Sequence, residues 1–122
     1  MSTLRELAAE SIGRITRRGL EPQIAQIDEA LAVGEKVVAV APGHEGGSGV
    51  VVVLTDRRLL ASRGAPFAKP ALQALALDQV VAVSAAADGA TWSLSAEHGG
   101  GPTVVGGMFD RDAQRFAALL SA

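Results

Sequence analysis

Short apolar segments separated by turn-forming residues fill the middle of this 122-residue chain. They are rich in Val, Leu and Ala, and Gly, Pro or Asp stands between them, which is typical of β-strands joined by tight turns. Residues 91–96 alternate apolar and polar side chains, as a strand with one solvated face does. The predicted strands are residues 36–41, 50–54, 59–62, 71–77, 80–86, 91–96 and 103–105. The chain is therefore predicted to be mainly β, built on antiparallel hairpins, with helices at both ends (α+β).

The N-terminal residues have the pattern of two amphipathic helices. Thr3 and Glu6 make a capping box, and the apolar spacing after them predicts one helix over about residues 3–18. Gly19 is expected to end this helix in a left-handed conformation, and Pro22 fits the first turn of the second helix. Because each helix has one apolar face, both must pack on the sheet or on a partner, and the sequence leaves this choice open. The expected partner-binding residues on these faces are Leu4, Leu7, Ile12, Ile15, Ile24, Ile27 and Leu31.

A third amphipathic pattern follows the last predicted strand. Asp110 is expected to cap this C-terminal helix, with Phe109 packing on it as a hydrophobic staple. The apolar side of the helix holds Ala113, Phe116, Ala117 and Leu120. We expect a chain of this length to form one domain with a single core. We therefore expect a helical hairpin at residues 1–33, packed on the same domain or on a partner, and a sheet-rich domain at residues 34–122.

Composition and charge exclude several classes of protein. The formal net charge is −2 and the chain has no Tyr, so a nucleic-acid-binding surface of basic and aromatic residues is not expected. Without Cys there is no disulfide, thiolate metal site or Cys nucleophile, which fits a reducing compartment. No signal-peptide core or run of roughly 20 apolar residues is present, so we expect a cytoplasmic protein.

Three segments resemble a known family. They are Ala32-Val33-Gly34-Glu35-Lys36, Val53-Leu54-Thr55-Asp56-Arg57-Arg58-Leu59-Leu60 and Leu77-Asp78-Gln79-Val80-Val81-Ala82-Val83. Over residues 31–120 the chain resembles bacterial pleckstrin-homology-like (PH-like) domains of the YokE type. The resemblance implies a barrel of about seven antiparallel strands capped by a C-terminal helix, and a non-enzymatic binding or assembly module. It does not supply a ligand.

The sequence contains one candidate site for an anionic partner. Lipid-binding PH domains hold phosphates with Lys and Arg beside the first hairpin loop, but residues 42–49 contain neither. Residues 34–70 instead carry five basic and three acidic side chains. The candidate residues for an anionic partner are Arg57, Arg58, Arg63 and Lys69. The alternative is that Arg57 and Arg58 are solvated turn residues or pair with Asp56, and we favour this reading.

Metal binding and catalysis have little support in the sequence. The candidate metal ligands are His44, Glu45, Glu97 and His98, in two loops expected at the same end of the barrel. Because those loops are glycine-rich and no ligand pair lies within one element, we expect no metal and no cofactor. Residues 46–49 lack the Lys-Ser/Thr of a P-loop, and neither Ser48 nor Ser62 lies in a G-x-S-x-G elbow, so we expect no enzymatic activity.

The sequence therefore predicts a binding module. The expected partner is a protein, including a second copy of the chain in a homo-oligomer, contacted through the N-terminal helices or an open sheet edge. A first alternative is a peripheral binder of anionic lipid that uses the basic segment 57–69, so membrane association stays open but not favoured. A second alternative is a small-ligand-binding or hydrolytic domain with its pocket at the glycine-rich loops.

Overall fold

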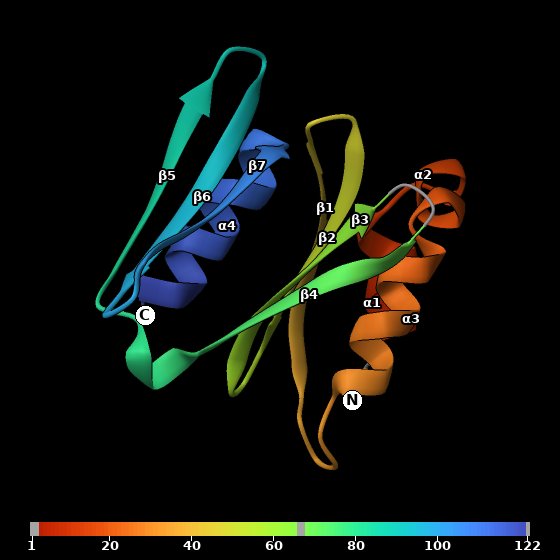
Figure 1. Cartoon of the computed structure of the whole chain (residues 1–122), viewed down its shortest axis with the longest axis horizontal. Helices are drawn as coiled ribbons and strands as arrows, with labels where there is room; N and C mark the ends of the chain where they lie inside the picture. The colour runs from red at the N-terminus through yellow and green to blue at the C-terminus, as the bar shows by residue number, and fades with distance from the viewer. Residues whose placement is uncertain (1–2, 66–67, 122) are drawn as a thin grey trace.

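Seven antiparallel strands in two sheets form the centre of the molecule (Figure 1). The computed structural model describes residues 3–65 and 68–121. The four-stranded sheet has the order β1-β2-β3-β4, made of β1 (Val37–Glu45), β2 (Ser48–Thr55), β3 (Arg58–Ala65) and β4 (Ala68–Ala76). The three-stranded sheet has the order β5-β6-β7, made of β5 (Ala82–Asp88), β6 (Thr91–His98) and β7 (Gly101–Met108).

Helices cover both ends of the chain, as the sequence predicted. Three lie before the first strand: α1 (Leu4–Ser11), α2 (Arg14–Gly19) and α3 (Glu21–Ala30). A 3₁₀ turn, η1 (Leu77–Gln79), joins the two sheets, and α4 (Asp110–Ser121) ends the chain. The predicted α+β class, with antiparallel strands and a C-terminal helix, is therefore confirmed. Within the described residues the two sheets stay separate, and β1 lies against β7 without ladder pairing. No described helix is long and apolar enough to span a membrane.

Both faces of strand β2 are buried, because each face of the four-stranded sheet is covered there. Side chains alternate along a strand, so Val50, Val52 and Leu54 point into one core. Val51 and Val53 point into the other. This two-sided burial explains why residues 50–54 are continuously apolar rather than alternating.

The first core lies between the two sheets and α4. Phe116 of α4 is fully buried there, beside Leu94 of β6 and Met108 of β7. The inward side chains of β6, Trp92, Leu94 and Ala96, all belong to this core, as their alternation predicted. The second core lies between the outer face of the four-stranded sheet and the N-terminal helices, which Figure 1 shows on the side of the sheet away from α4.

The predicted continuous helix over residues 3–18 is wrong. α1 ends at Ser11, Ile12 is extended (φ −123°, ψ 127°), and α2 begins only after Gly13. Ile12 is buried in the second core, and the low helix propensity of glycine favours the break beside it. Gly19 is the last residue of α2 rather than a left-handed residue beyond it. Pro22 does lie in the first turn of α3, as expected.

The strand ends and the start of α4 also differ from the prediction. β1 continues through Pro42 to Glu45, and the turn to β2 contains only Gly46 and Gly47, both at positive φ. Pro42 fits because β1 is an edge strand that pairs with β2 alone among the described residues. Asp110 is the first residue of α4 rather than its cap, and Phe109 is largely exposed rather than packed as a staple. Residues 66 and 67, between the predicted strands 59–62 and 71–77, lie outside the described residues.

Candidate functional site

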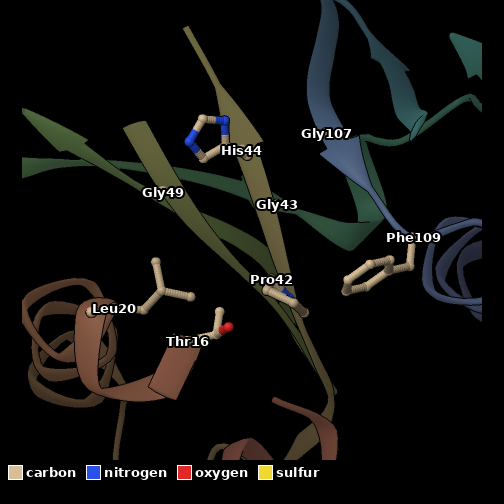
Figure 2. A pocket seen from close by; sticks show the side chains of 9 residues that line it. Thr16, Leu20, Pro42, Gly43, His44, Gly49, Gly107 and Phe109 are labelled. Atoms are coloured by element: carbon tan, nitrogen blue, oxygen red, sulfur yellow. The ribbon is translucent and has the colours of Figure 1, made fainter. Parts of the chain in front are cut away.

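An apolar cleft of about 300 Å³ opens between α2, the β1–β2 hairpin and the start of α4. Figure 2 shows Leu20 and Thr16 on the α2 side, and the ring of Phe109 directed toward Pro42 from the opposite side. The residues that line the cleft are Thr16, Gly19, Leu20, Pro42, Gly43, His44, Gly49, Gly107 and Phe109. Its volume is at the lower end of the range for ligand pockets, about 300 to 1,000 Å³.

Glycines build the walls of this cleft because the backbones approach too closely for side chains. A Cβ on Gly107, which has a φ of +67°, would collide with the backbone of His44. A Cβ on Gly43 would lie 2.9 Å from the carbonyl oxygen of Gly106. A Cβ on Gly49 would collide with the side chain of Leu20. These positions therefore let β7 and α2 close on the first hairpin, and much of the cleft surface is backbone.

Two large apolar side chains and two arginines lie on the elements that border the cleft. Phe109 is 64% exposed and Ile15 is 90% exposed. Ile15 lies between the exposed Arg14 and Arg18 on the solvent side of α2. The third arginine of α2, Arg17, instead donates to the carbonyl oxygens of Ala9 and Ile12 and fixes α2 against the end of α1.

This surface is not among the sites predicted from the sequence, although a signal for it was present. Residues 11–20 contain three arginines and no acidic residue, a denser positive charge than in residues 34–70. The prediction of a single helix over residues 3–18 hid the signal, because it assigned Ile15 to a packed face. The break at Gly13 turns α2 and exposes Ile15 together with its neighbouring arginines.

Few polar side chains line the cleft. Its lining contains one imidazole, His44, and one hydroxyl, Thr16, which come from different walls in Figure 2. A search of residues 3–65 and 68–121 finds no group of three His, Asp or Glu side chains that could hold a metal ion. The cleft can therefore bury an apolar group and offer a small number of hydrogen bonds to polar atoms next to that group.

The four candidate metal ligands lie at the ends of two strands. His44 and Glu45 end β1, whereas Glu97 and His98 end β6. Glu45 accepts a hydrogen bond from Arg63 at 2.7 Å and another from the N–H of Gly106 at 3.1 Å. The His98 ring nitrogen Nε2 lies 2.9 Å from the hydroxyl of Thr103. Glu45 and His98 thus have partners within the protein.

The candidate residues for an anionic partner do not form one patch. Arg58 binds Glu35, and Arg63 binds Glu45, Gln73 and the carbonyl oxygen of Val104. Arg57 and Lys69 are exposed. Asp56 accepts a hydrogen bond from the N–H of Lys36. Two of the four cations are thereby committed to internal pairs.

Arg58 belongs to a half-buried cluster around Glu35. The guanidinium of Arg58 donates to both Glu35 oxygens, at 2.6 and 3.0 Å, and to the carbonyl oxygen of Ala30. The Thr55 hydroxyl and the Ala32 N–H also donate to Glu35. The hydrogen bond from Arg58, opposed by burial and assisted by those from Thr55 and Ala32, lowers the pKa of Glu35 from 4.5 to about 2.

The predicted partner-binding residues of the N-terminal helices are mostly covered by the chain itself. Leu4, Ile12, Ile24 and Ile27 are buried in the second core, against the outer face of the four-stranded sheet. Leu7 and Leu31 are partly buried against the same core. Ile15 is the exposed member of the set.

Comparisons with known proteins complete the description of the site. No family model, no curated protein and no solved structure matches this chain. The geometry and chemistry of the described residues are therefore the basis for a function.

Proposed function

We propose that this chain is a non-enzymatic PH-like binding module that takes an apolar side chain of a partner protein into the cleft beside α2. The two antiparallel sheets with a helix at one end support the PH-like assignment. The observation that carries the function is the apolar cleft lined by the exposed Phe109, with Ile15 also exposed on α2, which contributes Thr16 and Gly19 to the cleft. Buried anchor side chains supply much of the energy in protein–protein interfaces, and exposed large apolar residues mark such sites.

The positive charge of α2 indicates which residues the partner should carry beside its apolar anchor. Arg14 and Arg18 flank Ile15, and residues 11–20 contain no acidic side chain. A partner segment that places an apolar residue in the cleft would gain favourable electrostatics from Asp or Glu next to that residue. We therefore expect a ligand with one Leu, Phe or Trp anchor and neighbouring carboxylates.

A peptide-display selection tests this function. The wild-type chain is used as bait for a random peptide library, and the enriched peptides are synthesised and measured by fluorescence anisotropy. We expect a shared apolar anchor with acidic neighbours, and a loss of about tenfold or more in affinity in Phe109→Ser and in Arg14→Glu/Arg18→Glu, since loss of an interface anchor costs more than about 1.4 kcal/mol.

The matched control for charge is Arg57→Glu/Lys69→Glu, which reverses two exposed cations that do not line the cleft. This variant should bind the selected peptides as the wild type does. Selected peptides that lack an apolar anchor, or that bind all variants equally, would contradict the proposal. Failure to enrich any peptide would also count against it.

A second candidate function is binding to an anionic membrane surface, and the exposure of Ile15 between Arg14 and Arg18 favours it. Apolar side chains that insert at the bilayer interface, combined with arginines near the headgroups, give salt-sensitive binding to anionic lipid. Here the cationic site is α2 rather than the predicted segment 57–69. Co-sedimentation with anionic vesicles should be lost in Arg14→Glu/Arg18→Glu and retained in Arg57→Glu/Lys69→Glu. Equal binding to neutral vesicles would reject this candidate.

A further inference from the structure

The two sheets end in edge strands of very different character. β5 reads Ala-Val-Ser-Ala-Ala-Ala-Asp, and in the described part of the chain it pairs with β6 on one side and with no strand on the other. Figure 1 shows β5 along one outer edge of the molecule. The free backbone groups of an edge strand bind another strand unless charges, proline or a covering element block them. β5 has no Lys, Arg, Pro or Gly along its whole length.

One edge strand of the other sheet, β4, has features that discourage pairing with a further strand. β4 carries Lys69 and Pro70 near its start, and both residue types discourage pairing at an edge. The side-chain amide of Gln26 in α3 donates to the carbonyl oxygen of Pro70, so the helix occupies part of this edge. The side chain of Gln73 bonds Arg63 and Thr103. β5 has neither the Lys and Pro residues of β4 nor, among the described residues, a helix side chain hydrogen-bonded to its edge.

We propose that β5 pairs with β5 of a second copy of this chain, antiparallel, so that the two three-stranded sheets join into one continuous sheet. A two-fold axis through Ala85 would place Ser84 opposite Ala86, and Ala82 opposite Asp88. The small side chains let the strands approach, and each Asp88 meets an alanine rather than the other Asp88. Like charges directly opposite each other destabilise a strand pair, and this register avoids them.

The residues that flank β5 also fit this pairing. Val81, just before the strand, is 77% exposed and lies next to the free edge. The same register places Val81 opposite Gly89 of the second copy. Gly89 has no side chain and no heavy atom within 4 Å of its ideal Cβ position, so it leaves room for Val81. The inward residues Val83 and Ala85 pack in the core between the sheets, which leaves the edge itself free.

This surface is separate from the cleft, and its test does not depend on the proposed function. Pairing through one short strand buries less than the ~1,200 Å² of a standard interface, so we expect weak dimers that require concentrations of ~10 µM to ~1 mM. Sedimentation velocity over this range should show a concentration-dependent change from monomer to dimer. Hydrogen exchange at residues 82–88 should slow as the dimer forms.

Charged residues added at two positions of β5 test the register. Ser84 and Ala86 are exposed, and in the dimer Ser84→Lys/Ala86→Lys places the new lysines opposite each other, so this variant should stay monomeric. Ser84→Glu/Ala86→Glu should also be monomeric, and an equimolar mixture of the two variants should form a heterodimer. The control, Ala71→Lys/Ala74→Lys on the edge strand β4, should dimerise as the wild type does. Circular dichroism shows whether each variant is folded.

Three outcomes would overturn the proposal. They are a wild-type chain that is monomeric over the whole concentration range, a dimer that persists in Ser84→Lys/Ala86→Lys, and a dimer without slowed exchange at residues 82–88. The last two would place the interface elsewhere on the molecule. Recovery of association in the mixture of oppositely charged variants would support the register directly, because unfolding of the variants cannot produce it.

Discussion

Replacement of Glu35 by Gln should reveal how much the cluster around Arg58 contributes to stability. The side chain of Glu35 is 0% exposed and that of Arg58 is 28% exposed. The cluster connects the segment after α3 to the turn between β2 and β3, two parts of the chain separated by about twenty residues in sequence. Glu35→Gln keeps the shape of the side chain but removes its charge, so Arg58 loses its ionic partner.

The size of the effect follows from the pKa of Glu35. A decrease from 4.5 in the unfolded chain to about 2 in the folded chain corresponds to about 3 kcal/mol of stability at neutral pH. Thr55 and Ala32 donate to different oxygens of Glu35, so the single glutamine oxygen can accept from only one of them, while Arg58 can reach water. We therefore expect Glu35→Gln to lower the free energy of unfolding by about 2 to 3 kcal/mol at pH 7.

The pH dependence gives a second, independent readout. Because the folded-state pKa is depressed, the contribution of Glu35 is fully present above pH 4.5 and is lost as the pH falls toward about 2. Urea titrations at several pH values should show the difference between wild type and Glu35→Gln shrinking across this window. The pair Arg58→Gln and Glu35→Gln, combined in a double-mutant cycle, should show a coupling energy above about 1 kcal/mol.

The control is Glu29→Gln, which removes a carboxylate from an exposed position on α3. We expect this change to alter stability by less than about 0.5 kcal/mol at any pH. A Glu35→Gln variant that behaves like Glu29→Gln, or whose loss of stability is the same at pH 7 and pH 3, would refute the reasoning.

Three further substitutions test particular positions by urea unfolding. Gly107→Ala should cost more than about 2 kcal/mol, because Gly107 has a positive φ and a Cβ there collides with the backbone of His44, whereas Gly99→Ala, with open space around it, should cost less than about 1 kcal/mol. Gly13→Ser should stabilise the chain by about 0.5 to 1 kcal/mol, since Gly13 caps α2 without a side-chain hydrogen bond at a φ of −57° that serine adopts easily. Burial raises the pKa of Asp112, and its Oδ2 atom is buried without a hydrogen-bond partner among the described residues. The wild type should therefore lose stability as the pH rises above the pKa of an unfolded Asp, and Asp112→Asn should be at least as stable as the wild type at pH 7 and not show that loss.

Local patterns predicted the strands and the terminal helices because each has a periodic signal of its own. The alternation in residues 91–96 places Trp92 and Leu94 inward, as found. Strand ends were predicted less well, because backbone pairing extends β1 through Pro42 and His44 despite their weak strand propensity. Neighbouring strands decide such boundaries, and a single sequence contains no direct record of them.

The cleft could not be predicted, because it depends on tertiary packing. Its walls come from α2, β1, β2, β7 and Phe109, which are far apart in sequence. A break at Gly13 turns Ile15 to solvent, and the spacing of apolar residues alone assigned Ile15 to a buried face. The charge of residues 11–20 was visible in the sequence, but its meaning depended on that break.

The three segments on which the proposed PH-like assignment rests are parts of one structural cluster. Glu35 comes from the first segment, and Thr55 and Arg58 come from the second. The N–H of Leu77, which opens the third segment, donates to the carbonyl oxygen of Arg57. All three segments therefore stabilise the end of the four-stranded sheet that holds the β2–β3 turn, whereas the cleft lies beside the β1–β2 turn at the other end of β2. A motif that is needed for folding can be shared by proteins with different ligands. The three segments are therefore relevant to the fold rather than to a ligand. The function has to be tested at the cleft and at the edge of β5.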